Sequence, residues 1–306
     1  MTIAIPTYNR AATFLPLALK SALAQTYDRI EVLVADNAST DTTEQLVRGW
    51  SDPRLTYHRH ARNVGPEENY NYCLNHASGD YFLLLHDDDL IDVDFVAACI
   101  EAAHYASTAA LVRTGIRIID EHGRVLRHAR NEVRDDGSLA DFFRAWFSGK
   151  TRWYLANTLF NTRRLKQTGG FHSPYRLAQD GFAIARLAPF GRAEVAEIKA
   201  SFRLHRNEQT FARPVAPVQW GLEWLRLLDF MCELVPAEEA PLLRREGARF
   251  FAKLTYHRAA STLHSPWQRL MAYYEIFQLF RAHCLPCPDL PALRSITRAV
   301  RCALRG

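Results

Sequence analysis

The chain has 306 residues, of which 48% are hydrophobic and 23% are charged, and its formal net charge is +5. This profile indicates one large folded domain, or a domain with an appendage, and it excludes an intrinsically disordered chain. Every apolar run is shorter than the roughly 18 residues of a membrane-spanning helix, and a strand-like segment stands where a signal peptide would begin, so we expect a cytoplasmic protein.

The first part of the chain alternates short apolar runs with amphipathic stretches. Strands are predicted at 2–6, 30–35, 55–58 and 81–85. Helices are predicted at 11–25, 42–50, 67–77 and 93–106. Because strands that alternate with helices pair in parallel, the pattern predicts a doubly wound, Rossmann-like α/β sheet.

The pattern changes in the second part of the chain. Strands at 110–120, 157–161 and 193–204 are predicted to alternate with helices at 139–147 and 180–188, and a hairpin turn is predicted at 121–124. From about Val218 onward, one helix follows another, interrupted by prolines. We therefore predict an α/β domain over residues 1–213 and a helical C-terminal extension over residues 214–306.

The cysteines are sparse and scattered, which disfavours a disulfide framework. Cys284 and Cys287 form the one close pair in the sequence. A structural zinc site would need two more ligands at similar spacing, so we predict buried or free thiols.

Polar residues gather where three of the predicted strands end. The first strand leads into Pro6-Thr-Tyr-Asn-Arg10, the second into Asp36-Asn-Ala-Ser-Thr-Asp41, and the fourth into His86-Asp-Asp-Asp89. In open α/β sheets, ligands bind at the carboxyl ends of the strands. The sequence therefore predicts one ligand site built from these three segments.

The run of Asp87, Asp88 and Asp89 points to a cation. Three successive carboxylates at the mouth of a buried strand repel one another, and a hard divalent ion would remove that penalty. Mg²⁺ or Mn²⁺ suits one or two carboxylates together with substrate phosphates. The alternative is a solvated acidic turn that caps the helix beginning near Val93.

In this order, the three motifs resemble those of glycosyltransferase family 2. Asn63-Val-Gly65, Asn71 and Ala77-Ser-Gly-Asp-Tyr81 also match the family's approach to its acidic motif, and the resemblance covers about residues 2–205. It implies the GT-A fold and the inverting transfer of a sugar from a nucleotide-diphosphate sugar, UDP- or dTDP-linked, to an acceptor hydroxyl. It also implies a place in cell-surface polysaccharide or glycolipid synthesis, with a glycan or a lipid-linked acceptor.

The resemblance assigns the donor site to residues at the strand ends and on the third predicted helix. These residues are Pro6, Thr7, Tyr8, Asp36, Asn69 and Asp87. Asp36 would accept a hydrogen bond from a ring N–H of a pyrimidine base, which a carboxylate can do and an apolar residue cannot. Its alternative role is an Asx turn or a cap. Asp87 would hold the ribose.

The resemblance also implies a metal site for Mn²⁺ or Mg²⁺. Asp88 would bind the ion, Asp89 would assist through a metal-bound water, and His205 would lie near the metal or the diphosphate. A structural histidine is the alternative for His205. His86 stands where many relatives have an aspartate, which leaves the division of roles among the three aspartates open.

An inverting transfer needs a general base, and Asp180 matches the position of the family's catalytic aspartate. It follows Gly169-Gly-Phe171 and begins a predicted helix, from which a carboxylate can reach an acceptor hydroxyl. Gln179 replaces the first acid of the family's usual pair. The alternative for Asp180 is a helix N-cap.

The last segment places four arginines on one helical face. They are Arg294, Arg298, Arg301 and Arg305. Such a face predicts peripheral contact with an anionic membrane at its inner face, where a lipid-linked acceptor would lie. The alternative is a helix packed on the rest of the protein with a solvated arginine face.

Three competing functions follow from the same sequence. His86 and Gln179 allow a catalytically inactive relative that only binds nucleotide sugars or glycans, although Asp88 and Asp180 are retained. The basic charge alone suggests a nucleic-acid partner, but no nucleic-acid motif accompanies it, so we predict none. A Rossmann dehydrogenase is disfavoured because the first strand leads into a proline rather than a glycine-rich turn.

Overall fold

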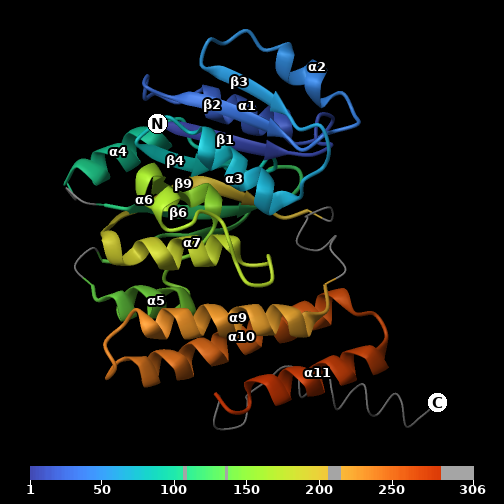
Figure 1. Ribbon diagram of the computed structural model, residues 1–306, viewed down its shortest axis with the longest axis vertical. Coiled ribbons are helices and arrows are strands. Elements are labelled where there is room, and N and C mark those ends of the chain that lie inside the picture. Colours follow the sequence, from blue (N-terminus) through green and yellow to red (C-terminus); the bar gives the residue numbers. More distant parts are fainter. Residues whose placement is uncertain (106–108, 135–136, 206–214, 284–306) are drawn as a thin grey trace. The chain divides into compact units, whose positions relative to one another are not determined.

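The computed structural model describes residues 1–105, 109–134, 137–205 and 215–283, which form two compact units (Figure 1). The first unit comprises Met1–Ser138, Ser148–His172 and Gln179–His205. The second takes in Leu139–Phe147, Ser173–Ala178 and the described helices that follow residue 214. The predicted domain boundary at residues 213–214 lies outside the described residues.

The first unit is built on one nine-stranded sheet, in which the order is β3-β2-β1-β4-β8-β6-β9-β5 and β7 pairs with β6. Figure 1 labels the first four strands of this order. The strands are β1 Thr2–Thr7, β2 Glu31–Asp36, β3 Leu55–Arg59, β4 Tyr81–Leu84, β5 Leu90–Ile91, β6 Leu111–Ile119, β7 Val125–Ala129, β8 Thr158–Asn161 and β9 Arg192–Arg203. β1 to β4 pair in parallel, as their alternation with helices predicts. β8 then runs antiparallel to both of its neighbours, β4 and β6.

The helices of the first unit follow the predicted order. They are α1 Leu15–Leu23, α2 Thr43–Arg48, α3 Pro66–His76, α4 Phe95–Tyr105, α6 Thr162–Gln167 and α7 Gln179–Leu187, with short 3₁₀ turns at Leu155–Asn157 and Ala188–Phe190. α1 begins four residues later than the predicted start at residue 11, and Pro16 occupies its first turn, where no backbone N–H is needed. The sequence did not predict β5 or α6, which are only two and six residues long.

The central strands are buried on both faces. Ile3 and Ile5 of β1 pack with Leu83 of β4 into the core that α1 and α4 cover. Phe82 of β4 points to the opposite face of the sheet, where its ring centroid lies 6.2 Å from that of Phe171. Because successive side chains of a strand point to opposite faces, burial on both faces makes these strands read as continuous apolar runs. The strands thus place the polar residues at their ends on a rigid support.

A buried ion pair joins β6 and β9. Arg113 Nη2 lies 2.9 Å from Glu194 Oε2, and the two side chains are only 0% and 1% exposed. Thr151 Oγ1 accepts a further hydrogen bond from the guanidinium at 3.0 Å, and Asn131 Nδ2 donates to Glu194 Oε2. Breaking such a pair leaves one charge buried without its counter-charge.

We expect Glu194→Gln to lower the free energy of unfolding by about 3–5 kcal/mol, because it keeps the shape of the side chain and strands the buried guanidinium. Urea denaturation measures this loss. Glu44→Gln is the matched control: Glu44 and Arg48 form an exposed ion pair on α2, with side chains 44% and 66% exposed, whose loss should cost less than about 1 kcal/mol. Equal effects of the two substitutions would contradict the prediction.

The second unit is helical, as predicted from about Val218 onward. Its helices are α5 Leu139–Ser148, α9 Pro217–Glu233, α10 Ala240–Thr262 and α11 Pro266–Phe280. Aromatic rings fill its interior: Trp224 of α9 stacks on Phe251 of α10 with ring centroids 5.1 Å apart, and Trp146 of α5 contacts both rings.

Cys73, Cys99 and Cys232 are buried free thiols, as predicted. The pair Cys284 and Cys287 lies outside the described residues, and so does the predicted arginine face at 294–305. Within the described part of the chain, no helix is both long enough and apolar enough to cross a membrane.

Candidate functional site

The sheet brings the three predicted motifs together. β1 and β2 pair so that Thr7 lies opposite Asp36, and β4 adjoins β1 on its other side. Thr7 Oγ1 donates a hydrogen bond to Asp87 Oδ2 at 2.7 Å, and Arg10 Nε lies 3.9 Å from Asp87 Oδ1. The end of the first strand is therefore joined directly to the acidic motif.

The acidic motif contains a group that fits a metal ion. His86, Asp88 and Asp89 each offer one ligand atom, and these atoms lie within 4.8 Å of one another. Imidazole and carboxylate donors suit first-row divalent ions. His86 was not predicted as a metal ligand, because it stands where many relatives have an aspartate. Its position beside two carboxylates at a strand end was the feature of the sequence that could have indicated a metal ligand.

The electrostatics of the aspartates also fit a cation. Burial and the charge of Asp88 raise the pKa of Asp87 to about 7. Burial opposes ionisation of Asp88 too, but a hydrogen bond from His205 and the nearby charges of His86 and Arg10 outweigh it and lower the pKa of Asp88. Positive charge at this position therefore already stabilises the ionised form of Asp88, and a bound dication would stabilise the ionised forms of both carboxylates more strongly.

Residues at and just after the end of β9 form hydrogen bonds with the acidic motif. The backbone N–H of Arg203 donates to Asp89 Oδ1 at 2.9 Å, and its Nε donates to the carbonyl of Asp88 at 2.8 Å. His205 Nε2 lies 2.9 Å from Asp88 Oδ2, and its ring packs against Phe14 with centroids 4.8 Å apart. His205 thus contacts a candidate ligand, and its own role as a ligand stays a prediction.

The predicted nucleoside residues lie at the ends of β1 and β2. Pro6 and Thr7 are buried, whereas Tyr8 is 36% exposed and available to a ligand. Asp36 is fully buried: Oδ1 accepts from the backbone N–H of Ser39 at 2.8 Å, and Oδ2 accepts from the hydroxyl of Tyr57 at 2.6 Å. Asp36 thus accepts from the backbone N–H three residues later, as a capping residue does, and a cap was one of the alternative roles that the sequence left open.

Asn69 is more deeply buried than contact with a nucleotide base alone would require. It is 2% exposed; Nδ2 donates to the carbonyl of Ala35 at 3.0 Å, and Oδ1 lies 3.0 Å from His60 Nε2. The amide therefore joins the end of β2 to the residue that follows β3, and its contact with a base stays a prediction.

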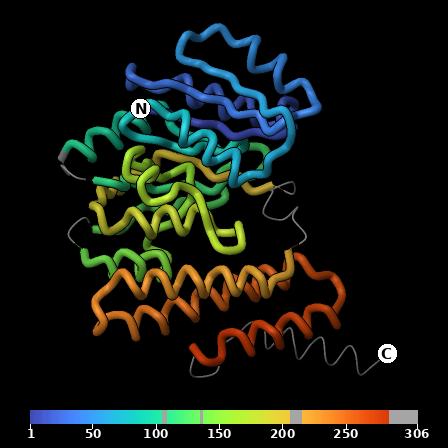
Figure 2. The backbone as a smooth tube through the Cα atoms, in the orientation of Figure 1, coloured from blue at the N-terminus to red at the C-terminus, as the bar shows by residue number. Residues whose placement is uncertain are grey.

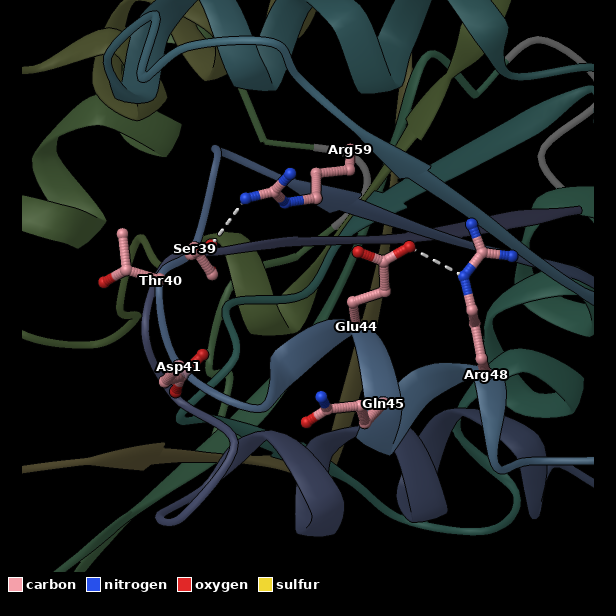
Figure 3. Close-up of a pocket in the computed structure, with 7 residues that line it drawn as sticks. All are labelled: Ser39, Thr40, Asp41, Glu44, Gln45, Arg48 and Arg59. Carbon is pink, nitrogen blue, oxygen red and sulfur yellow. Dashed lines mark hydrogen bonds and ion pairs between the residues drawn. The ribbon is translucent and has the colours of Figure 1, made fainter.

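A polar pocket lies beside this region, at the start of α2 (Figure 3). It is lined by Ser39, Thr40, Asp41, Glu44, Gln45, Arg48 and Arg59. Arg59 links it to the predicted nucleoside residues, since Nη2 donates to the carbonyl of Ser39 at 2.9 Å and Nε lies 3.8 Å from Asp36 Oδ2. Ser39, Thr40 and Asp41 belong to the second of the three predicted segments, but none of the residues assigned to the donor, the metal or the base lines this pocket.

Asp180 is the second residue of α7, so it lies inside the first helical turn rather than at the N-cap. Its Oδ1 accepts from the backbone N–H of Gly181 at 2.8 Å. Tyr70 of α3 connects it with the acidic motif: burial and the charges of Asp180 and Asp88 raise the pKa of Tyr70.

The Tyr70 hydroxyl lies 3.1 Å from His86 Nε2. The charges of Asp180 and of the acidic motif therefore both act on the Tyr70 hydroxyl, which also contacts His86, a candidate metal ligand. Tyr70 was not predicted from the sequence, because α3 carries many polar residues and nothing in its pattern distinguishes this one.

Comparisons with known proteins place the chain among sugar-transferring enzymes. The family described as Glycosyl transferase family 2 matches residues 2–178. An uncharacterized glycosyltransferase of Rickettsia felis is 25% identical over 277 residues, which are 86% of this chain and 44% of the relative. Succinoglycan biosynthesis protein ExoO of Rhizobium meliloti is 27% identical over 264 residues, 84% of this chain and 72% of the relative. The chain thus spans less than half the length of the Rickettsia relative.

Solved structures share the fold. S. aureus TarS 1-349 in complex with UDP-GlcNAc matches with a TM-score of 0.60 and 18% identity over 92% of this chain and 89% of that one. The mannosyltransferase PcManGT from Pyrobaculum calidifontis, in complex with GDP-Man and Mn²⁺, matches with a TM-score of 0.58 and 20% identity over 99% of this chain and 80% of that one. At these identities the likeness shows the fold alone, which is the predicted GT-A fold.

Proposed function

The chain belongs to glycosyltransferase family 2, and we propose that it transfers a sugar with inversion from a UDP- or dTDP-linked donor to an acceptor hydroxyl. The observation that carries this proposal is the meeting of β1, β2 and β4 at one end of the sheet. Their terminal residues join Thr7 to Asp87, and Tyr70 lies near both the acidic motif and Asp180. The residues proposed for donor binding and for base catalysis therefore lie in one region of the first unit.

We assign metal binding to His86, Asp88 and Asp89, with His205 beside them. The chemistry that Mn²⁺ or Mg²⁺ supplies when bound is neutralisation of the charge that develops on the departing diphosphate. The TarS structure, in complex with UDP-GlcNAc, and the PcManGT structure, in complex with GDP-Man and Mn²⁺, support a nucleotide-sugar donor, and the TarS complex supports the choice of UDP. The Mn²⁺ of PcManGT supports the choice of ion.

The base in this proposal is Asp180. Its carboxylate accepts the proton of the acceptor hydroxyl while the oxygen attacks the anomeric carbon from the face opposite the leaving diphosphate. Arg10 adds positive charge beside Asp87, which holds the ribose. Asp36 and Tyr8 bind the base of the nucleotide, with Tyr57 and the backbone of Ser39 keeping the Asp36 carboxylate in place.

The acceptor in this proposal is a glycan or a lipid-linked sugar, in cell-surface polysaccharide or glycolipid synthesis. The name of the ExoO relative, a succinoglycan biosynthesis protein, supports the polysaccharide class. Peripheral membrane contact through the arginines at 294–305 belongs to the same proposal.

We expect UDP or dTDP to raise the melting temperature only when Mn²⁺ or Mg²⁺ is present, because ligand that binds the folded state through a shared ion stabilises it by mass action. At about 100 times Kd the gain is about 2.7 kcal/mol. Differential scanning fluorimetry with and without EDTA measures the shift. Equal stabilisation in EDTA would contradict a donor site that depends on the ion.

A screen of nucleotide sugars for Mn²⁺-dependent hydrolysis tests the activity itself. Turnover of one donor, with release of its nucleoside diphosphate, is the expected result. The second candidate function is an inactive nucleotide-sugar-binding relative, which Gln179 favours because it replaces an acid of the usual pair. Binding of nucleotide sugars without any turnover, toward water or sugar acceptors, would favour that function.

A further inference from the structure

A buried glutamate of the second unit has no part in the proposed chemistry. Glu223 lies on α9 and is 0% exposed. Its Oε2 accepts a hydrogen bond from the backbone N–H of Tyr175 at 3.0 Å, and its Oε1 accepts from the backbone N–H groups of Leu177 and Ala178, each at 3.1 Å. A buried carboxylate normally needs this kind of charge-assisted pairing, and here it is supplied by one short loop.

The loop Ser173–Ala178 has an unusual backbone. The N–H of Arg176 donates to the carbonyl of Ser173 at 3.2 Å, which closes a tight turn. Arg176 then has a φ of 58°, in the left-handed region that residues other than glycine seldom adopt. Such a conformation costs of order 1–3 kcal/mol and persists only where its surroundings hold it. The Glu223 carboxylate binds the N–H groups on both sides of Arg176 and so provides that hold.

The loop leads without a break into the segment that carries Asp180 (Figure 2). Ala178 is fully buried, and its N–H is one of the three that Glu223 binds. Gln179, the next residue, is the first residue of α7, and Asp180 is the second. α7 therefore begins one residue after the last contact with Glu223, and Asp180 lies two residues after that contact.

We infer that Glu223 is a positioning residue for the general base: it fixes the turn at Arg176 and, through the backbone, the start of α7 from which Asp180 acts. This inference rests on the proposed role of Asp180. It gives the helical C-terminal unit a part in the transfer step, because α9 carries the carboxylate that orders the loop.

The physical basis is the sensitivity of a general base to its position. A base must lie within hydrogen-bond reach of the proton that it removes. Displacement by about 1 Å can reduce the rate by about 10²-fold. Loss of the carboxylate would release the turn and with it the backbone before Asp180, while the strand ends that bind the nucleotide keep their own hydrogen bonds.

Glu223→Gln tests this in the full-length chain. The amide keeps the size of the side chain, but one of its two terminal atoms is a donor that faces backbone N–H groups. We expect kcat for hydrolysis of the nucleotide sugar found by the screen to fall by about 10- to 100-fold, with unchanged KM for that donor and unchanged Kd for UDP with Mn²⁺. Trypsin should also cleave after Arg176 faster than in the wild type.

Glu233→Gln is the matched control, because Glu233 is exposed on the same helix. It should match the wild type in every measurement. If Glu223→Gln does not fold by circular dichroism, Glu223→Asp replaces it; this variant keeps the charge but is one methylene shorter, and we expect the same changes at smaller size.

A double-mutant comparison separates this inference from the proposed function. If Glu223 acts through Asp180, adding Glu223→Gln to Asp180→Asn should cost no further activity. Independent, multiplying losses would overturn the inference, and so would a Glu223→Gln variant that turns over like the Glu233→Gln control. If Asp180→Asn itself keeps wild-type turnover, the base assignment fails, and faster tryptic cleavage in Glu223→Gln would then report a structural clamp only.

Discussion

Asp180→Asn should lower the rate of sugar transfer by about 10²–10⁴-fold, the usual range for loss of a general base. The substitution keeps the shape of the side chain and removes its basicity. The affinity for UDP in the presence of Mn²⁺ should stay near that of the wild type, because the nucleotide contacts the strand ends. Steady-state rates and isothermal titration calorimetry measure the two quantities separately.

The alternative to catalysis at this position is a structural role at the start of α7. Asp180 lies inside the first turn, where asparagine costs only a few tenths of a kcal/mol of helix stability. A structural aspartate would therefore leave turnover almost unchanged. Near-wild-type transfer by Asp180→Asn would move the base to another residue.

Asp88→Asn should weaken Mn²⁺ binding by more than the 10- to 100-fold that is typical when an outer-shell partner of a metal is lost. Asp88 is a candidate ligand, so its substitution removes both a donor atom and a negative charge. UDP binding that depends on Mn²⁺ should weaken with it, and transfer should fall. Electron paramagnetic resonance of free Mn²⁺ measures the first effect, and calorimetry with UDP measures the second.

Asp94→Asn is the control for Asp88→Asn, since Asp94 is a half-exposed aspartate paired with Lys199 at the start of α4. It should bind Mn²⁺ and UDP as the wild type does. An Asp88→Asn variant with wild-type Mn²⁺ affinity would place the ion elsewhere. If both Asp88→Asn and Asp180→Asn weakened UDP binding equally, the division between donor binding and base chemistry would be wrong.

Much of the fold follows from the sequence because the strands of the first half are apolar runs with polar ends. β1 and β4 are buried on both faces, so their residues form uninterrupted apolar segments that a periodicity reading finds. β5 has two residues and is defined only by its pairing with β9, which the local sequence does not encode. The antiparallel placement of β8 likewise depends on tertiary contacts with β4 and β6.

The candidate site was predictable where it consists of residues that follow strands. Asp87, Asp88 and Asp89 could be found in this way, and so could Thr7. His86 could be found only by asking what an imidazole does beside carboxylates. Tyr70 contacts a residue 16 positions away, and Glu223 contacts residues about 46 positions away. The local sequence of α3 or α9 does not predict contacts at such separations.

The aromatic packing of α5 has a consequence for synthesis on the ribosome. Trp146 and Phe147 of α5 pack against Phe250 and Phe251 of α10, about 100 residues later in the chain. At roughly 5–20 residues per second, α5 waits about 5–20 s for these partners to be translated. Trp224 of α9, which also contacts Trp146, is translated earlier, so part of this face finds a partner before α10 is made. We therefore expect the nascent chain to expose apolar side chains of α5 until α10 is translated.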